Sequence, residues 1–344
     1  MSGQKTMTTA TGHKRAALRD VFGRPFRDLR ISVTDRCNFR CTYCMPAEIF
    51  GERYEFLPRK DLLTFEEITR VTRILLRLGG MKLRLTGGEP LVRNGVEHLV
   101  AMLAKLDGAN DLTMTTNGYL LPKFAQKLKD VGLERVTVSL DSLDDEVFKM
   151  MNGRGFGVLS VLAGIEAAEN AGFPPIKINA VVIRGVNDHT VVDTARYFKE
   201  RGHIVRFIEY MDVGNLNGWK MDQVVTADEI IAMIDREMPL EPVESEYRGE
   251  VANRYRYRDG SGEIGVIASV TKPFCGDCTR LRLSPEGQLY TCLFGTKGAD
   301  IRAPLRSGAS DDDIEAVIRK TWAARTDRYS EERTSMTAPR RKVE

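Results

Sequence analysis

The run DLRISVTDRCNFRCTYC, residues 28–44, places a short β-rich segment directly before three cysteines. Residues 30–34 predict a strand, and Cys37, Cys41 and Cys44 follow it with C-x3-C-x2-C spacing. Clustered cysteines in a reducing compartment favour metal ligation over disulfides. Three thiolates leave the four-ligand shell of a structural zinc incomplete, and no nearby histidine has suitable spacing. The loop therefore predicts a four-iron, four-sulfur (4Fe-4S) cluster with one iron open to a ligand.

From residue 30 onward the chain repeats a β-rich run followed by a helical pattern, and six such units are present. The expected strands are residues 30–34, 82–86, 112–116, 135–140, 176–183 and 204–210. The expected helices are residues 64–78, 95–106, 121–131, 158–171 and 189–201. This alternation predicts an α/β fold, a partial (β/α)6 TIM-type barrel with parallel strands, in which ligands bind at the carboxyl ends of the strands.

The pattern changes after residue 213, and we expect four segments. They are a flexible leader at residues 1–25, the partial barrel at 26–213, a C-terminal cluster-binding region covering the barrel mouth at 214–322, and a polar tail at 323–344. In the third segment we expect a helix over 226–237 and strands over 252–257 and 263–270. We expect poor order in the tail unless a partner or the active site holds it.

Composition excludes several classes of protein. The 344 residues carry a formal net charge of +3, which is too small to indicate general nucleic-acid binding. No apolar run is long enough to cross a bilayer, so we expect no membrane span. The first 20 residues lack the apolar core of a secretory signal, and we expect a cytoplasmic protein.

A second group of three cysteines, Cys275, Cys278 and Cys292, again lacks a fourth ligand. It predicts a second cluster whose open iron could bind a substrate atom, such as a ring nitrogen or oxygen of a base. A zinc ribbon missing one ligand is the alternative. Arg280 and Arg282 lie on one side of an extended segment and suit phosphate.

Three further cations accompany the predicted barrel strands, namely Arg30, Arg84 and Lys177. Taken singly, each is more often an ordinary strand-edge cation. Together with the paired arginines they predict a polyphosphate substrate, if the topology brings them to one cavity. Gly87-Gly88-Glu89-Pro90 follows the second expected strand. Its two glycines permit close backbone approach to a ligand, although the run alone is also a plausible turn.

These motifs resemble the GTP 3′,8-cyclase family of the radical S-adenosylmethionine superfamily, over residues 26 to about 300. The superfamily signature is the first cysteine loop with an aromatic residue before its last cysteine. The segments that carry the family resemblance are residues 28–37, 86–90, 115–118, 138–141, 207–212 and 274–278.

The resemblance implies two 4Fe-4S clusters, one radical-generating at Cys37, Cys41 and Cys44, the other on the substrate side at Cys275, Cys278 and Cys292. It implies S-adenosylmethionine contacts from Tyr43, Gly88, Ser139 and Met211. It implies GTP contacts from Arg30, Arg84, Thr115, Lys177, Arg280 and Arg282. The implied reaction is cyclisation of GTP by a 5′-deoxyadenosyl radical, the first step of molybdenum cofactor biosynthesis. A reductant, a downstream cyclic pyranopterin monophosphate synthase and assembly as a homodimer are the implied partners.

One departure and three alternatives stay open. The family ends in a Gly-Gly pair, whereas residues 334–344 hold no terminal glycines, so a paralogue with altered or reduced activity is an alternative. A two-cluster radical enzyme acting on a peptide or another small molecule is the second, and it leaves the paired arginines without an anion. A zinc-containing nucleic-acid-binding protein is the third, and it lacks four-ligand sites.

Overall fold

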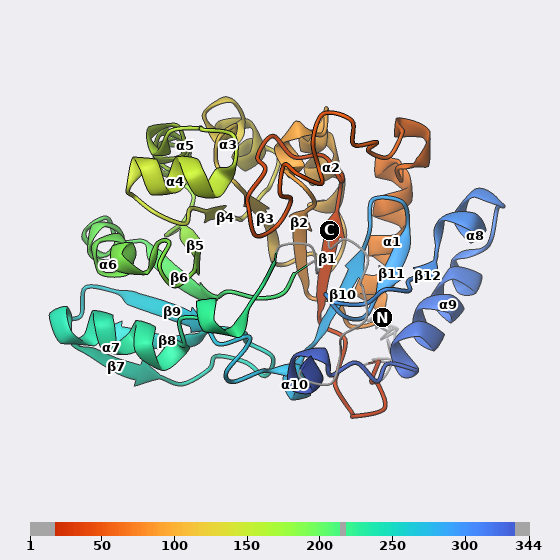
Figure 1. The fold of residues 1–344 in the computed structure, drawn as a ribbon. Helices are drawn as coiled ribbons and strands as arrows, with labels where there is room; N and C mark the ends of the chain where they lie inside the picture. The colour runs from red at the N-terminus through yellow and green to blue at the C-terminus, as the bar shows by residue number, and fades with distance from the viewer. Residues whose placement is uncertain (1–17, 214–217, 334–344) are drawn as a thin grey trace, which may run out of the picture.

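The computed structural model describes residues 18–213 and 218–333, whose strands form one 12-stranded sheet (Figure 1). The order across the sheet is β12-β11-β10-β1-β2-β3-β4-β5-β6-β9-β8-β7. The strands from β10 to β9 in this order pair in parallel, and the outer pairs on both sides are antiparallel. The expected α/β fold of the partial-barrel type is therefore confirmed.

The six expected strands are all present, as β1 (Asp28–Ser32), β2 (Lys82–Thr86), β3 (Leu112–Thr116), β4 (Arg135–Ser139), β5 (Lys177–Val182) and β6 (Ile204–Glu209). The five expected helices are α1 (Phe65–Arg77), α2 (Val96–Leu103), α3 (Leu121–Asp130), α5 (Val158–Asn170) and α6 (Val191–Glu200). A further helix, α4 (Asp145–Asn152), was not expected; Asp144 caps its start by accepting from the backbone of Glu146 and Val147. Short 3-10 turns are η1 (Arg59–Asp61), η2 (Pro90–Val92), η3 (Asp188–Thr190), η4 (Met221–Gln223) and η5 (Cys275–Asp277).

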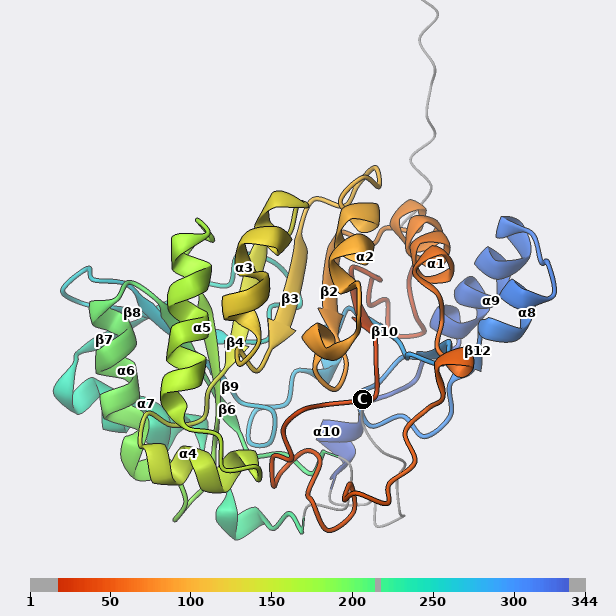
Figure 2. The same cartoon turned by 90° about the horizontal axis from the view of Figure 1, so that it is seen from above.

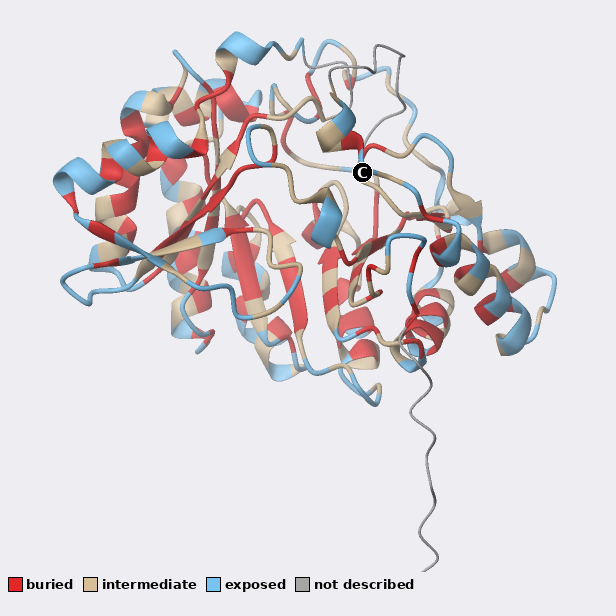
Figure 3. Cartoon of the chain, turned by 90° about the horizontal axis from the view of Figure 1, so that it is seen from below, coloured by how far each residue is buried: buried red, intermediate tan, exposed pale blue. Residues whose placement is uncertain are grey.

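The two faces of the sheet differ in character because side chains alternate along a strand. Leu83 and Leu85 of β2 are fully buried in the apolar core between the sheet and the helices. Lys82 and Arg84 alternate with them and face the concave side. Helices α1 to α6 cover the convex side in Figure 2, and Figure 3 shows burial concentrated along the strands and the inner faces of the helices. The concave side is thus left for polar residues.

The C-terminal region extends the same sheet at both edges. β9 (Glu263–Ile267) pairs in parallel with β6, and β10 (Arg280–Leu283) pairs in parallel with β1. Antiparallel additions are β7 (Leu240–Val243), β8 (Asn253–Tyr257), β11 (Gln288–Tyr290) and β12 (Ala299–Asp300). The remaining helices are α7 (Ala227–Glu237), α8 (Arg302–Arg306), α9 (Asp311–Ala323) and α10 (Tyr329–Glu332). The expected boundary at residue 213 therefore does not separate two sheets.

Both ends of the described chain are packed, which differs from the sequence expectation. In the tail expected to be poorly ordered, Arg325 is 4% exposed and Tyr329 is 6% exposed. In the expected flexible leader, Arg19 and Pro25 form an isolated antiparallel β-bridge, and Arg24 is fully buried. These polar segments pack because their charges pair with one another. The rest of both predictions, residues 1–17 and 334–344, lies outside the described residues.

No helix among the described residues has the length and apolar character needed to cross a membrane.

Candidate active site

Two cavities adjoin on the concave side of the sheet, and each receives one cysteine group. Cys37, Cys41 and Cys44 line the first cavity, and Cys275, Cys278 and Cys292 line the second. Five residues line both and form the wall between them: Arg30, Thr86, Arg282, Cys292 and Leu293. The two cysteine groups, more than 200 positions apart in sequence, therefore meet across one shared wall.

Arg40 holds the first cysteine loop through hydrogen bonds to backbone carbonyl groups. This arginine is 5% exposed, and its guanidinium donates to the carbonyl oxygens of Cys37 at 2.8 Å and Phe50 at 2.6 Å. Between Cys41 and Cys44 the chain makes a single turn, since the Cys44 amide donates to the Cys41 carbonyl at 3.0 Å. The C-x3-C-x2-C spacing folds as a compact loop whose three cysteines line the cavity.

Gly87-Gly88-Glu89-Pro90 packs directly against this loop. A Cβ atom on Gly88 would lie 2.2 Å from the carbonyl oxygen of Arg36, so no larger residue fits without moving the loop. Gly87 adopts a φ of 145°, which favours glycine. Buried Glu89 accepts from the Thr116 hydroxyl and the Asn117 amide, both at 2.7 Å, and so ties the end of β2 to the end of β3.

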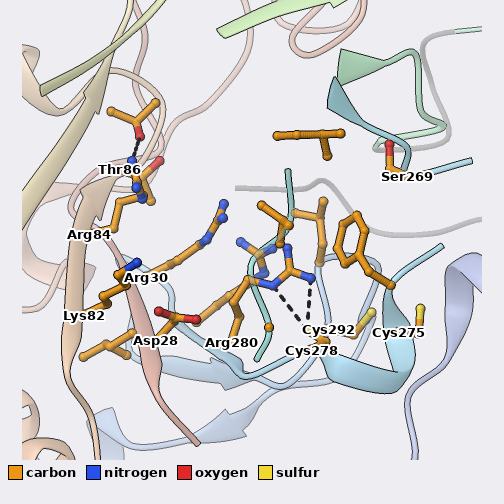
Figure 4. A pocket seen from close by; sticks show the side chains of 18 of the residues that line it. Asp28, Arg30, Lys82, Arg84, Thr86, Ser269, Cys275, Cys278, Arg280 and Cys292 are labelled. Carbon is orange, nitrogen blue, oxygen red and sulfur yellow. Dashed lines mark hydrogen bonds between the residues drawn. The ribbon is translucent and has the colours of Figure 1, made fainter. Parts of the chain in front are cut away.

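The second cysteine group begins in η5 and leads into β10. The Arg280 guanidinium donates to the Cys278 thiol sulfur from Nε at 3.2 Å and Nη2 at 3.1 Å (Figure 4). Burial alone would raise the pKa of Cys278, but Arg280 and Arg325 lower it to about 6. These arginines thus favour the thiolate of Cys278, the form that binds iron, whereas burial raises the pKa of Cys292.

The donor set suits a cluster better than a single ion. Within residues 18–213 and 218–333, no three Cys, His, Asp or Glu side chains come close enough to hold one metal ion. A single zinc draws its thiolates to about 2.3 Å, which requires such closeness. In an iron–sulfur cluster the thiolates bind different irons, so ligands spread around a cavity are compatible with it.

Arginines from three adjacent strands form a row on the second cavity. Arg30 of β1 pairs in register with Arg84 of β2 on one side and with Arg282 of β10 on the other. Figure 4 shows Arg30 and Arg84 projecting into the pocket from one wall, with Arg280 reaching toward Cys278. The sequence could not show whether these arginines reach one cavity. They do so because β10 pairs with β1 in the sheet.

Few carboxylates balance these cations. Eight basic and three acidic side chains line the second cavity: Arg30, Lys82, Arg84, Arg135, Arg206, Arg280, Arg282 and Arg325 against Asp28, Asp111 and Asp327. Burial first, then the neighbouring arginines, lower the pKa of Arg30 to about 9 and that of Arg84 to about 10. Buried like charges of this kind are stabilised by a bound anion.

The expected binding residues divide by location. Of the two cavities, Arg30 and Arg282 line both, Gly88 lines the first alone, and the second alone is lined by Arg84, Thr115, Met211 and Arg280. Lys177 lines a third, smaller pocket at the amino ends of the strands. Tyr43 and Ser139 line none of these three pockets. The Tyr43 hydroxyl donates to Asp141 at 2.8 Å, and Ser139 ends β4 opposite Asn179.

Sequence reasoning missed Lys82, Arg135 and Arg206, which line both the second cavity and the third pocket. These shared residues connect the barrel mouth to the amino ends of the strands. Lys82 lies two positions before Arg84 in the same strand. Because side chains alternate along a strand, the sequence alone predicts that both lie on one face. Arg206 lies in β6 among apolar residues, which is another signal for an inward-facing cation.

Family models match most of the chain. Residues 31–198 match the radical SAM superfamily, and residues 203–331 match Molybdenum Cofactor Synthesis C. Among solved structures, SuiB of Streptococcus suis bound to its precursor peptide SuiA aligns with a TM-score of 0.60 at 15% identity, covering 91% of this chain and 68% of that one. Methylornithine synthase (PylB) aligns with a TM-score of 0.51 at 17% identity, covering 86% of each chain. These structures share the fold.

Curated relatives are much closer in sequence. A GTP 3′,8-cyclase of Acidothermus cellulolyticus is 57% identical over 318 residues, which are 91% of this chain and 88% of the relative. A GTP 3′,8-cyclase of Staphylococcus haemolyticus is 49% identical over 327 residues, 95% of this chain and 96% of the relative. With matches of this identity over nearly the full length of both chains, and with both cysteine groups facing adjoining cavities, the chain belongs to the GTP 3′,8-cyclase family of radical S-adenosylmethionine enzymes.

Proposed function

We propose that this protein converts GTP to (8S)-3′,8-cyclo-7,8-dihydroguanosine 5′-triphosphate, the first step of molybdenum cofactor biosynthesis. The observation that carries the proposal is the shared wall of the two cavities, formed in part by Arg30, Arg282 and Cys292. Because these residues line both cavities, a radical formed in the first cavity would form next to a nucleotide held in the second. The identity to curated cyclases supports the same assignment.

Cys37, Cys41 and Cys44 would hold the first cluster, and Gly88 would let S-adenosylmethionine approach the backbone beside it. When bound, this cluster supplies the electron that cleaves S-adenosylmethionine to methionine and the 5′-deoxyadenosyl radical, which removes the C3′ hydrogen of GTP. Tyr43, Ser139 and Met211 would complete the S-adenosylmethionine site, with Met211 contacting it from the second cavity. Because its hydroxyl is committed to Asp141, Tyr43 would contribute through its backbone or its ring.

Cys275, Cys278 and Cys292 would hold a second 4Fe-4S cluster, whose open iron would bind the guanine base. The triphosphate would then lie along the cationic wall. Arg30, Arg84 and Arg282 stand at Cα positions in register on three adjacent strands, and their guanidiniums would offer several forked donors to phosphate oxygens. Thr115 accepts from Arg84 at 2.8 Å, which fixes the direction of that guanidinium. Arg280 would contact both the second cluster and the triphosphate, since its guanidinium already donates to the Cys278 sulfur.

Lys177 would contact the far end of the triphosphate, because its pocket continues from the second cavity through Lys82, Arg84, Arg135 and Arg206. A reductant would supply one electron for S-adenosylmethionine cleavage, and a second electron with a proton would reduce the cyclised nucleotide radical. A downstream cyclic pyranopterin monophosphate synthase would consume the product. Assembly as a homodimer is part of the same proposal and is supported by the family resemblance.

The test uses the anaerobically reconstituted full chain with S-adenosylmethionine, dithionite and GTP deuterated at C3′. We expect one deuterium in 5′-deoxyadenosine and a new nucleotide that is an isomer of GTP lacking that deuterium. Deuterated ATP serves as the control, and no transfer from it is expected. If 5′-deoxyadenosine forms at the same rate without GTP and carries no deuterium, the proposal is wrong.

A further inference from the structure

The second cysteine group is linked to one largely buried charge network built from the two ends of the described chain. This network, which we call the end clasp, consists of Asp20, Arg24, Arg325 and Asp327. The side chains of Asp20 and Arg24 are fully buried, and that of Arg325 is 2% exposed. Charges buried this deeply persist only when they are paired and hydrogen-bonded.

Arg24 contributes the N-terminal half of the clasp. Its Nε donates to Asp20, and its Nη1 donates to the carbonyl oxygens of Cys275 and Asp327, both at 2.8 Å. One guanidinium therefore joins the chain start, the first cysteine of the group and the chain end. Asp20 Oδ1 also accepts from the Arg24 amide at 2.9 Å, which fixes the hairpin that carries the arginine.

Arg325 and Asp327 contribute the C-terminal half, after α9. Arg325 Nη1 donates to the carbonyl oxygen of Cys278 at 2.6 Å and lies 3.5 Å from Asp20 Oδ2. Asp327 Oδ2 accepts from the hydroxyl of Thr291 at 2.5 Å, and Thr291 is the residue before Cys292. The clasp thus touches the backbone of two cysteines and the neighbour of the third.

Apolar packing holds the clasp in place. The indole nitrogen of Trp322 donates to the carbonyl oxygen of Arg24 at 3.2 Å, and its ring meets Phe26 edge-on at 5.5 Å. Trp322 and Phe26 are buried in the main core. A rigid base of this kind lets the two arginines fix the positions of the carbonyl groups they contact.

We propose that Arg24 and Arg325 are positioning residues for the second iron–sulfur cluster, acting on the conformation of the Cys275–Cys278 loop through its carbonyl groups. The inference rests on the second cluster of the proposed function and is independent of GTP. Pinning both carbonyls fixes the direction in which each thiolate leaves the backbone. Two buried cations beside three thiolates also offset the negative charge that the bound cluster carries.

The experiment measures iron in two cysteine backgrounds of the full chain. One has serine at Cys37, Cys41 and Cys44, so it retains the second site, and the other has serine at Cys275, Cys278 and Cys292. Arg24→Gln, Arg325→Gln and Arg325→Lys are introduced into each. Arg196→Gln is the matched control, because its pairs with Asp193 and Glu237 lie on the surface away from both cysteine groups.

After anaerobic reconstitution each unaltered background should bind about four iron per chain. In the second-site background, both glutamine variants should lose iron to a chelator about ten- to a hundredfold faster, the usual effect of removing an outer partner of a metal ligand. Arg325→Lys should keep more iron than Arg325→Gln and retain the unaltered low-temperature EPR spectrum. The first-site background and the Arg196→Gln control should be unchanged.

Unaltered iron retention in both glutamine variants would overturn the proposal. So would equal iron loss in both backgrounds with a changed far-UV circular dichroism spectrum, since that marks a general folding role. If the unaltered second-site background binds no cluster, the second-cluster part of the proposed function fails instead. If the unaltered protein binds both clusters but has no cyclase activity, the GTP assignment is contradicted and the proposal on Arg24 and Arg325 is not affected.

Discussion

Arg30 and Arg282 lie directly opposite each other in the parallel pairing of β1 with β10, although 251 positions separate them in sequence. Both side chains line both cavities, and their pKa values fall because of burial and then because of neighbouring arginines. Placing two buried cations side by side costs stability unless an anion is bound. The pair therefore supports the phosphate-binding role that we propose for this wall.

Replacing Arg30 should separate stability from binding. Arg30→Gln removes one of three like charges in a row, so the free energy of unfolding of the nucleotide-free protein should rise, by on the order of 1 kcal/mol. GTP affinity should fall about ten- to a hundredfold, as expected for loss of a charged hydrogen bond. Chemical denaturation and equilibrium binding measure the two effects. Arg73→Gln, exposed on α1, is the control and should change neither.

Replacing a cysteine of the first group and one of the second should affect the formation of 5′-deoxyadenosine differently. Cys41→Ser should abolish formation of 5′-deoxyadenosine, because the first cluster loses a ligand that faces the proposed S-adenosylmethionine cavity. Cys292→Ser should keep slow, GTP-independent cleavage and lose the acceleration by GTP. Quantifying 5′-deoxyadenosine with and without GTP distinguishes them. Intact cleavage in Cys41→Ser would contradict the assignment of the first site.

Replacing a glycine by alanine should affect the first cysteine loop, which packs against Gly88, and should not affect the second, which contains Gly276. In Gly88→Ala the new methyl group would meet the Arg36 carbonyl at 2.2 Å, which forces the first cysteine loop to move. We expect loss of about four iron per chain after reconstitution. Gly276→Ala is the matched control in the second loop, since nothing lies within 4 Å of its Cβ. Equal iron content in the two variants would show that the close approach at Gly88 is not required.

Lys177 should make GTP binding depend on pH. Burial, followed by Arg206, Arg135 and Lys82, lowers its pKa to about 8. Near pH 8 part of the population is neutral, so a bound phosphate should draw in a proton. Calorimetry in buffers of different ionisation enthalpy should detect this uptake, and Lys177→Met should abolish it. No uptake in the unaltered protein would place Lys177 away from the triphosphate.

The same shift has a consequence for stability without nucleotide. Because the folded protein disfavours the charged form, the unfolded chain binds more protons between pH 8 and the ordinary lysine pKa of about 10.4. Stability should therefore rise with pH across this window, relative to Lys177→Met. Urea unfolding at both ends of the window, under anaerobic conditions, provides the measurement. A decrease relative to the variant would contradict the lowered pKa.

Local pattern was sufficient for the repeating part of the fold. The runs that became β2 and β3 were bounded correctly because alternation and flanking polar residues mark strand ends. α1 begins after Thr64, whose capping box with Glu67 is readable from sequence. The helix α4 was not expected, although its eight residues equal the length of α2, which was expected.

The sequence by itself determined the two cysteine groups, the radical-enzyme family and the parallel sheet, because ligand spacing and side-chain period are local properties. Tertiary structure alone decided that β10 joins β1, which aligns Arg282 with Arg30, and that Arg24 and Arg325 bind the carbonyl oxygens of Cys275 and Cys278. Both depend on pairing between distant segments. No local spacing encodes such pairing, since the buried charges at the chain ends look in sequence like those of an exposed polar tail.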